Sequence, residues 1–262
     1  MYIAGYSASV LIGISLGLIG GGGSVLTVPV LVYLFHIDAL LATSYSLFIV
    51  GTTSVVGSIS YLRKQLVDAP TVAFFGIPSV MAVLLTRAFI LPYIPAEIVE
   101  LGSFIVTKDM LLLLFFAVLM VVASYSMIRS SQKQASTHRH VNRVSVVFQG
   151  ILTGLITGLI GAGGGFLIIP ALVNLLKIPM KTAIGTSLVI ISINSLSGFL
   201  FSLRHSPVDW PFLLGIAAIA VLGILIGSYL STKVDGKKLK PAFGWFILVM
   251  GIYILVKEIF IK

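Results

Sequence analysis

The chain has 262 residues, of which 58% are apolar and 10% are charged. Soluble domains average about 45–50% apolar and about 25% charged residues, so this composition excludes an ordinary soluble enzyme. The lack of cysteine excludes disulfides and cysteine-based metal sites, and the net charge of +9 reports either a ligand or a membrane topology.

Eight apolar segments are long enough to lie in a membrane, because a membrane helix needs roughly 20 mostly apolar residues. The first run continues too far for a signal peptide, so we expect it to stay in the mature chain. The longest polar stretch is Arg129–Arg143, which has the size of one loop. We therefore predict an all-α polytopic membrane protein. Its segments are Gly5–Phe35, Ala39–Leu62, Thr71–Tyr93, Met110–Ile128, Ser145–Leu176, Thr182–Leu203, Phe212–Leu230 and Phe243–Phe260.

An internal repeat appears when the chain is shifted by 141 residues against itself. Gly13–Pro70 then aligns without a gap to Gly154–Pro211, and 24 of the 58 aligned positions are identical. The identities include glycine, proline, arginine and aspartate, which chance matches between apolar stretches would not align together. We predict a first repeat at residues 1–130, a basic cytoplasmic loop at 131–143 and a second repeat at 144–262. Internal duplication is typical of secondary transporters.

The basic residues favour inverted rather than parallel repeats under the positive-inside rule. Eight simple crossings would divide the 17 Lys and Arg residues 9 to 8 between the two sides. If the first and fifth segments each enter and return on one side, the division becomes 12 inside and 5 outside. The outside group is then Arg87, Lys108, Arg204, Lys257 and Lys262. We therefore expect re-entrant first and fifth segments, with both termini outside.

Two glycine clusters interrupt these re-entrant segments, at Gly20–Gly23 and Gly161–Gly165. Consecutive glycines weaken a helix, and unwound backbone within a membrane is tolerated where it is buried in protein or lines a wet cavity. A half-helix that starts near Ser24 or Gly165 would point free N–H groups into such a cavity, which suits an anion. The alternative is that the glycines serve close helix packing, which is the interpretation we favour for Gly13, Gly17, Gly154 and Gly158.

The two copies of G-x-x-x-G-x-x-G-x-G-G followed by proline resemble the sulfite exporter TauE/SafE family, also called the toluene sulfonate uptake permease family. The resemblance covers nearly the whole chain. It implies movement of sulfite, sulfoacetate or related organosulfur anions across the inner membrane. The two copies are not equivalent, because the first has Ser24 where the second has Gly165, and Gly21 where the second has Ala162.

Polar residues in the second segment of each repeat are further candidates for the site. Hydroxyl and amide donors can bind sulfonate oxygens without a full charge in the membrane. Asn194 is the least expected of them, and its alternative role is an interhelical hydrogen bond. Most of the serines and threonines are expected to bond their own helix backbone. The complete candidate set for substrate binding is Gly21, Gly22, Gly23, Ser24, Ser54, Arg63, Gly163, Gly164, Gly165, Asn194, Ser195 and Arg204.

Arg63 and Arg204 occupy equivalent helix ends, where they either bind a multi-oxygen anion or anchor the helix at the interface. Arg87 is expected at the interface as well, although a substrate could still contact it. Asp68 and Asp209 either pair with these arginines or cap the helices that follow. All eight acidic residues fall at helix ends or in loops, so no buried carboxylate and no proton relay is expected.

These features predict a secondary transporter of small anions, namely sulfite or organosulfonates, that works by alternating access in the inner (plasma) membrane. The alternatives are a transporter of another substrate class, such as a metal ion or an amino acid, and an anion channel. No catalytic cluster, metal site or nucleotide-binding motif is visible, so we expect no enzymatic activity and no cofactor. The expected partners are the anion and the lipid bilayer, without nucleic acid. A homodimer remains open.

Overall fold

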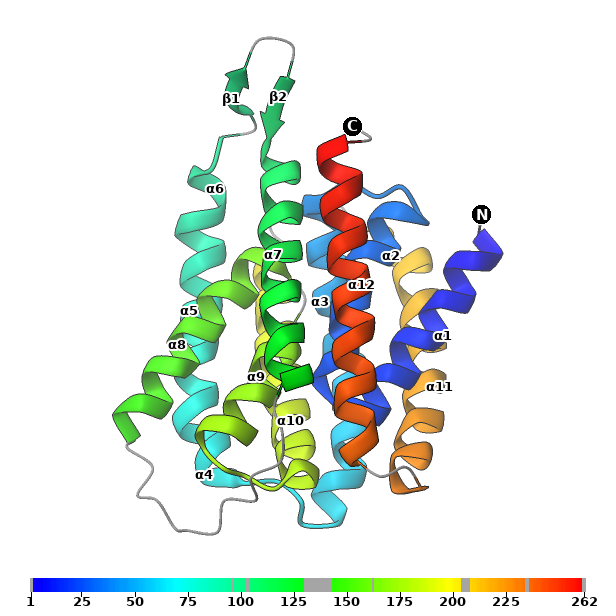
Figure 1. The fold of residues 1–262 in the computed structure, drawn as a ribbon, viewed down its shortest axis with the longest axis vertical. Coiled ribbons are helices and arrows are strands. Elements are labelled where there is room, and N and C mark those ends of the chain that lie inside the picture. Colours follow the sequence, from blue (N-terminus) through cyan, green and yellow to red (C-terminus); the bar gives the residue numbers. More distant parts are fainter. Residues whose placement is uncertain are drawn as a thin grey trace.

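The computed structural model describes residues 2–95, 97–101, 104–129, 143–161, 163–203, 208–233 and 236–260. The first repeat opens with helix α1 (Tyr2–Ile19), which stops at the glycine cluster. A 3₁₀ turn, η1 (Gly21–Leu26), then leads into the short helix α2 (Thr27–Tyr33). Figure 1 shows α1 entering from the end of the molecule that holds both termini, and α2 lying toward that same end.

Three long helical segments follow in the first half. Helix α3 (Ala39–Arg63) is continuous. The next segment runs from Ala69 to Tyr93 through α4 (Ala69–Thr71), the π-turn η2 (Val72–Gly76), α5 (Ile77–Leu85), the π-turn η3 (Thr86–Ile90) and α6 (Leu91–Tyr93). A two-stranded antiparallel hairpin, β1 (Glu97–Leu101) and β2 (Phe104–Thr107), connects it to α7 (Lys108–Arg129).

The second half repeats this order of elements. Helix α8 (Arg143–Ile160) stops at the second glycine cluster, and α9 (Gly165–Pro170) continues into the π-turn η4 (Ala171–Leu175). Three long helices then follow: α10 (Met180–Ser202), α11 (Trp210–Lys233) and α12 (Gly236–Phe260). In Figure 1, α8 enters from the end of the molecule opposite to the one from which α1 enters.

The two halves pack against each other through equivalent pairs of helices. The first helix of each half lies along a helix of the other half, α1 along α11 and α8 along α5, while α3 packs along α10. Gly13 of α1 meets the carbonyl of Ala220, and Gly154 of α8 meets the carbonyl of Ser79. Both members of these pairs differ by 141, so the repeat offset extends beyond the aligned sequence into α5 and α11.

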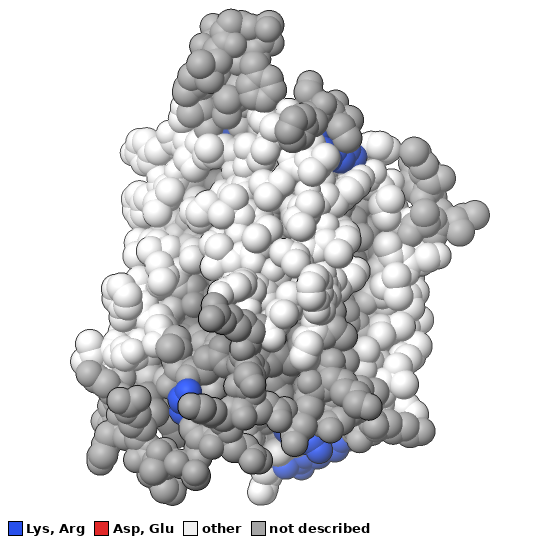
Figure 2. Space-filling view, viewed as in Figure 1, with Lys and Arg blue, Asp and Glu red and all other residues white. Residues whose placement is uncertain are grey.

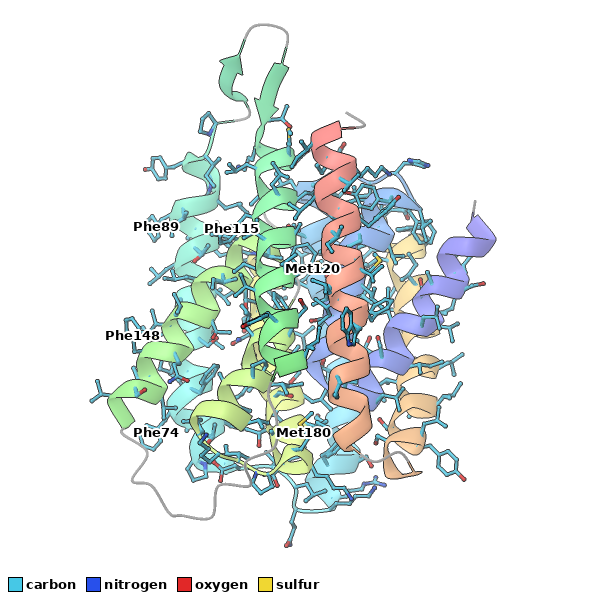
Figure 3. The ribbon with its side chains drawn as sticks, in the orientation of Figure 1. Phe74, Phe89, Phe115, Met120, Phe148 and Met180 are labelled. Carbon is cyan, nitrogen blue, oxygen red and sulfur yellow. The ribbon has the colours of Figure 1, made fainter. Side chains whose placement is uncertain are left out.

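The outer surface of this bundle is apolar over its long sides. Phe74, Phe89 and Phe148 point away from the bundle in Figure 3, and Phe148 is 64% exposed. In Figure 2 uncharged residues form the described surface across the middle, and the visible Lys and Arg lie toward the two ends. Such a surface suits a lipid bilayer, because exposed apolar patches of this extent are rare on soluble monomers.

The structure confirms the predicted all-α class, and among the described residues five helical segments are long and apolar enough to cross a membrane. Shorter apolar helices lie at Gly5–Ile19, Gly23–Tyr33 and Val144–Ile160, in the two segments that we predicted to be broken. Helix α12 begins at Gly236, seven residues before the predicted Phe243. The β1–β2 hairpin lies between the third and fourth predicted segments and was not predicted.

Candidate functional site

The two glycine clusters meet at one point, which we call the glycine crossing (Gly20–Gly23 with Gly163–Gly165). A Cβ added to Gly21 would overlap the Cα of Gly165, and a Cβ added to Gly165 would overlap the backbone of Gly21. The two backbones are therefore in direct contact, and only glycine fits at either position. This geometry explains Gly21 and Gly165 by packing, which is the alternative that the sequence left open for the clusters.

Several glycines of the two clusters also need their unusual backbone angles. Gly163 and Gly164 have φ values of +68° and +67°, and Gly20 and Gly161 both have +73°. Residues with a Cβ rarely adopt this left-handed region, so these positions turn the chain between the two arms of each hairpin. Gly22 lies in η1, between Gly21 and Gly23.

The helical arms that leave the crossing start without side-chain caps. Gly20 precedes η1 and Gly164 precedes α9, and neither start has a capping hydrogen bond from a side chain. The first N–H groups of a helix have no intrahelical partner and carry a partial positive charge. The two uncapped starts therefore bring a positive backbone potential to the centre of the molecule.

Most buried hydroxyls nearby bond to their own helix, as expected from sequence. Ser24 donates to the carbonyl of Gly21 at 2.6 Å, and Thr52 donates to the carbonyl of Phe48 at 2.8 Å. Ser54 and Ser195 differ, because both are fully buried and neither hydroxyl has a hydrogen-bond partner, which is also true of Thr27, Ser46, Thr86 and Thr157.

These two serines occupy equivalent positions, near the middle of α3 and of α10. A Cβ added to Gly163 would lie 2.9 Å from Ser195 Oγ, which places this hydroxyl at the crossing. A buried hydroxyl without a partner is costly, by about 1–3 kcal/mol, and is a candidate for contact with a ligand.

Asn194 makes the interhelical hydrogen bond that was its alternative role. Its Nδ2 donates to Ser79 Oγ of α5 at 2.7 Å, and its Oδ1 has no partner. Arg63 is exposed at the end of α3, which agrees with an interfacial anchor, and its equivalent Arg204 lies outside the described residues. The predicted basic loop also lies outside them, except for Arg143, where α8 begins.

Asp68 and Asp209 act as helix caps. Asp68 Oδ2 accepts a hydrogen bond from the backbone N–H of Thr71 at 3.0 Å, and Asp209 Oδ1 accepts one from that of Phe212 at 3.2 Å. Their own N–H groups bond across the halves, that of Asp68 to Thr186 Oγ1 at 2.9 Å and that of Asp209 to Tyr45 Oη at 2.8 Å. Thr186 and Tyr45 again differ by 141.

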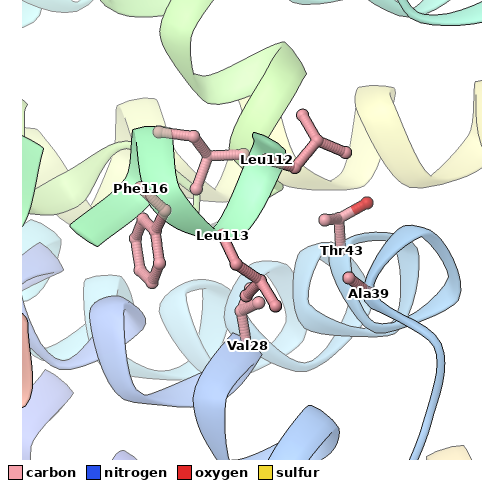
Figure 4. Close-up of a pocket in the computed structure, with 7 residues that line it drawn as sticks. Val28, Ala39, Thr43, Leu112, Leu113 and Phe116 are labelled. Carbon is pink, nitrogen blue, oxygen red and sulfur yellow. The ribbon is translucent and has the colours of Figure 1, made fainter. Parts of the chain in front are cut away.

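A small cavity lies beside the start of the second cluster (Figure 4). Its volume is about 10 Å³, which is the space of about one water molecule and too small for sulfite. Thr43 contributes the hydroxyl that Figure 4 shows among apolar side chains, and its backbone is in contact with Gly161. The conformation is therefore closed at this point. The other lining residues are Val28, Ala39, Leu112, Leu113, Phe116 and Ile160.

Arg87 corrects one of our predictions, because it is buried rather than interfacial. It lies in η3 and is 3% exposed. Its Nη1 donates to Ser44 Oγ at 3.2 Å and also to Ser202 Oγ, and its Nη2 donates to Thr43 Oγ1 at 3.3 Å. Its Nε has no partner. We call this group the arginine cluster (Arg87, Thr43, Ser44 and Ser202).

The arginine cluster holds a charge at considerable cost. No carboxylate in the described part of the chain accepts a hydrogen bond from Arg87. An arginine at the centre of a membrane helix costs about 2.5–3.5 kcal/mol on insertion scales, so such residues usually mark a substrate path. One feature of the sequence could have singled out Arg87. The position equivalent to it under the repeat offset is Ser228, so only the first half has an arginine there.

Glu258 corrects the expectation that no carboxylate is buried. It lies near the end of α12, as predicted, but it is 0% exposed. Its Oε1 accepts a hydrogen bond from Tyr33 Oη at 2.9 Å, and the Nζ of Lys257 lies 3.8 Å from the centre of the Tyr33 ring. These contacts connect the end of α2 to α12, at the end of the molecule that holds both termini (Figure 1).

Comparisons with known proteins cover almost the whole chain. The family model described as sulfite exporter TauE/SafE matches residues 6–254. A probable membrane transporter protein of Xylella fastidiosa (strain 9a5c) is 29% identical over 252 residues, which cover 94% of this chain and 91% of that protein. The probable membrane transporter protein YunE of Bacillus subtilis (strain 168) is 25% identical, with 93% of each chain covered. No solved structure matches the chain.

Proposed function

The chain belongs to the sulfite exporter TauE/SafE family, a family of membrane transporters and not of enzymes, and we propose that it carries small sulfur oxyanions by alternating access. The substrates are sulfite or organosulfonates, and the membrane is the inner (plasma) membrane. The observation that carries this proposal is the glycine crossing. There, two uncapped helix starts lie at the centre of the bundle and a buried, unpartnered serine hydroxyl adjoins them.

The chemistry of the crossing supports an anion over a cation. Uncapped backbone N–H groups and hydroxyls both donate hydrogen bonds, and the helix starts add a partial positive charge. A sulfonate or sulfite oxygen accepts such bonds, so Ser54 and Ser195 would bind it from α3 and α10. A metal ion would need carboxylates or imidazoles instead. Among the described residues, no group of three or more His, Asp or Glu side chains is placed to hold one.

Alternating access requires the closed conformation to open at the crossing. The direct contact between Gly21 and Gly165 leaves no space for an anion between them, so substrate entry must separate the two hairpins or shift them against α3 and α10. We propose that the hairpins move as units on either side of the crossing, as discontinuous helices do in other secondary transporters.

We also propose that the two repeats are inverted in the membrane. The opposite entry of α1 and α8 in Figure 1 and the 12 to 5 division of basic residues both support this arrangement. Because the chain lacks cysteine, single cysteines report topology directly. An impermeant thiol reagent on intact cells should label Tyr93→Cys, at a position that is 83% exposed, and should leave Lys64→Cys unlabelled until the cells are permeabilised. The reverse pattern would contradict the orientation.

Flux into proteoliposomes tests the transport proposal. Purified protein should move ³⁵S-sulfite down its gradient, with saturation at high concentration and competition by ethanesulfonate, while protein-free vesicles should not. Flux that rises without saturation would instead indicate the anion channel. If neither sulfite nor an organosulfonate moved, the proposed substrate class would be wrong.

A further inference from the structure

Arg87 is connected to the second glycine cluster through Thr43 and keeps unused hydrogen-bond donors. A guanidinium has five N–H donors in a fixed fork. In the arginine cluster three of its bonds go to hydroxyls of α3 and α10, while Nε has no partner. Because the side chain is only 3% exposed, Nε–H does not reach water at the surface of the protein either. The cluster therefore offers a planar, buried donor group whose Nε–H lacks an acceptor.

The hydroxyls around Arg87 do not neutralise its charge. Thr43 Oγ1 already donates to the carbonyl of Leu40 at 2.8 Å, and Ser202 Oγ donates to that of Gly198 at 3.0 Å. These side chains therefore receive the guanidinium N–H groups as neutral acceptors. A buried charge is stable when an opposite charge pairs with it. A bound anion would supply that charge.

The second half of the chain has no equivalent cation. Under the repeat offset, Ser228 is equivalent to Arg87. Ile184 and Gly185 are equivalent to Thr43 and Ser44, so the two hydroxyls of α3 are also missing. Several contacts between the halves follow this offset, such as Gly13 with Ala220 and Gly154 with Ser79, whereas Arg87 has no counterpart in the second half. The π-turn that carries Arg87 is also of a kind that occurs often at functional sites.

We infer that the arginine cluster is a second anion-binding site, on the side of the crossing that holds α6 and both termini; this assignment rests on the proposed function. The ligand class is a sulfur oxyanion, whose two oxygens on one face match the parallel N–H groups of a guanidinium. Nε–H and the second N–H of Nη2 bind these oxygens. The hydroxyls of Ser44 and Ser202 accept from Nη1 and hold the guanidinium in place.

Thr43 connects this second site to the crossing. Its Oγ1 accepts from Arg87 Nη2 at 3.3 Å, its backbone is in contact with Gly161, and it lines the small cavity of Figure 4. An anion that leaves the crossing toward this side therefore meets Thr43 and then Arg87. Because only one half has the cation, the two directions of exit are chemically different.

Anion-dependent melting of the purified full-length protein tests the assignment. The variants are Arg87→Met, which removes the charge, Arg87→Lys, which keeps the charge without the fork, and Lys64→Gln as a control at an exposed position. The probes are sodium sulfite and sodium ethanesulfonate, with sodium gluconate at equal ionic strength as the reference. A ligand that binds the folded state raises the melting temperature, and a titration of that rise gives the dissociation constant.

We expect wild type and Lys64→Gln to bind both probes equally well, and Arg87→Met to bind them about tenfold to a hundredfold more weakly. Arg87→Lys should fall between them. In gluconate Arg87→Met should melt no lower than wild type, because it removes an unpaired buried charge. A purely structural arginine predicts the opposite pattern, namely a lower melting temperature in gluconate and unchanged binding in the folded Arg87→Lys protein. That result would overturn the assignment.

The wild-type result separates this assignment from the proposed function. If sulfite and ethanesulfonate do not stabilise the wild type, the proposed substrate class fails, and phosphate and nitrate are then titrated against the same variants. Stabilisation by either anion that depends on Arg87 would keep the second anion site with a different ligand. If every anion that stabilises the wild type stabilises Arg87→Met equally, or if none of the four anions stabilises the wild type, the second anion site is overturned.

Discussion

In the first half of the chain a π-turn places Arg87 against hydroxyls from two helices, whereas the second half has Ser228 at the equivalent position. Away from this difference the halves share several hydrogen bonds. The backbone N–H of Asp68 bonds to Thr186 and that of Asp209 bonds to Tyr45, with each pair related by the same offset of 141. The two halves thus share caps and helix contacts, while they differ in charge at the position of Arg87.

The crossing shows the same combination of shared packing and local difference. Gly21 and Gly165 fit backbone to backbone, yet they are not equivalent positions, because the first-half residue equivalent to Gly165 is Ser24. The repeat offset therefore relates the helices of the two halves, but it does not relate the two glycines that meet at the crossing. Substitutions at paired positions should separate what the halves share from what each half contributes alone.

The largest effect is expected from adding one methyl group at the crossing. Gly165→Ala would force a Cβ into the backbone of Gly21, so we expect a loss of about 3 kcal/mol or more in stability, at the upper end of overpacking effects. Gly215→Ala is the matched control, because nothing lies within 4 Å of its added Cβ. Thermal unfolding in detergent measures both. Equal melting temperatures for the two variants would contradict the tight contact.

Ser54→Ala and Ser195→Ala should weaken substrate binding with little change in stability. Each removes a buried hydroxyl without a partner, and a hydrogen bond to a charged ligand contributes about 1.5–3 kcal/mol. We expect about a tenfold or greater rise in the half-saturating sulfite concentration for flux, similar in both halves. Ser58→Ala is the control, since this hydroxyl donates to its own helix at Val55. If Ser58→Ala raised the half-saturating sulfite concentration as much as Ser54→Ala and Ser195→Ala do, the result would contradict the proposed site.

The helix caps should contribute equally in the two halves. Asp68→Ala and Asp209→Ala each remove a cap, and we expect each to cost about 1 kcal/mol of stability. Asp38→Ala provides the matched control, because Asp38 precedes α3 without a capping hydrogen bond. A clear difference between Asp68→Ala and Asp209→Ala in melting temperature would show that the reciprocal contacts are not energetically equivalent.

The smallest effect is expected at Asn194. Asn194→Thr introduces the residue that the first half has at Thr53 and removes the hydrogen bond to Ser79, worth about 0.6 kcal/mol between membrane helices. A double-mutant cycle with Ser79→Ala measures this coupling in thermal unfolding. If flux instead fell strongly at unchanged stability, Asn194 would act on the substrate, as the sequence allowed.

The sequence predicted the elements of the fold because their signals are local. The length of the apolar segments and the aligned repeat predicted eight segments. The glycine clusters predicted that the first and fifth of them are broken. Capping by Asp68 and Asp209 was one of the two roles that the sequence left open, and each cap bonds a residue near in sequence. The contact of Gly21 with Gly165 was not accessible in this way, because it depends on how two distant hairpins meet.

Arg87 and Glu258 show the second limit of the sequence. An arginine six residues before the end of an apolar segment is explained equally well by snorkelling to the interface and by burial. Only the packing of α3 and α10 around η3 decides between them. Glu258 likewise lies near a helix end, and its burial depends on Tyr33, which lies 225 residues earlier in the chain.

The position of a bound anion decides whether its path runs through the glycine crossing. Crystals grown with 2-bromoethanesulfonate would locate the ligand through the anomalous signal of its bromine. We predict a peak inside the bundle, with the sulfonate in contact with Ser54 and Ser195 at the glycine crossing or with Arg87 beside it. A peak confined to the outer surface, with both buried groups unchanged, would contradict an anion path through the crossing.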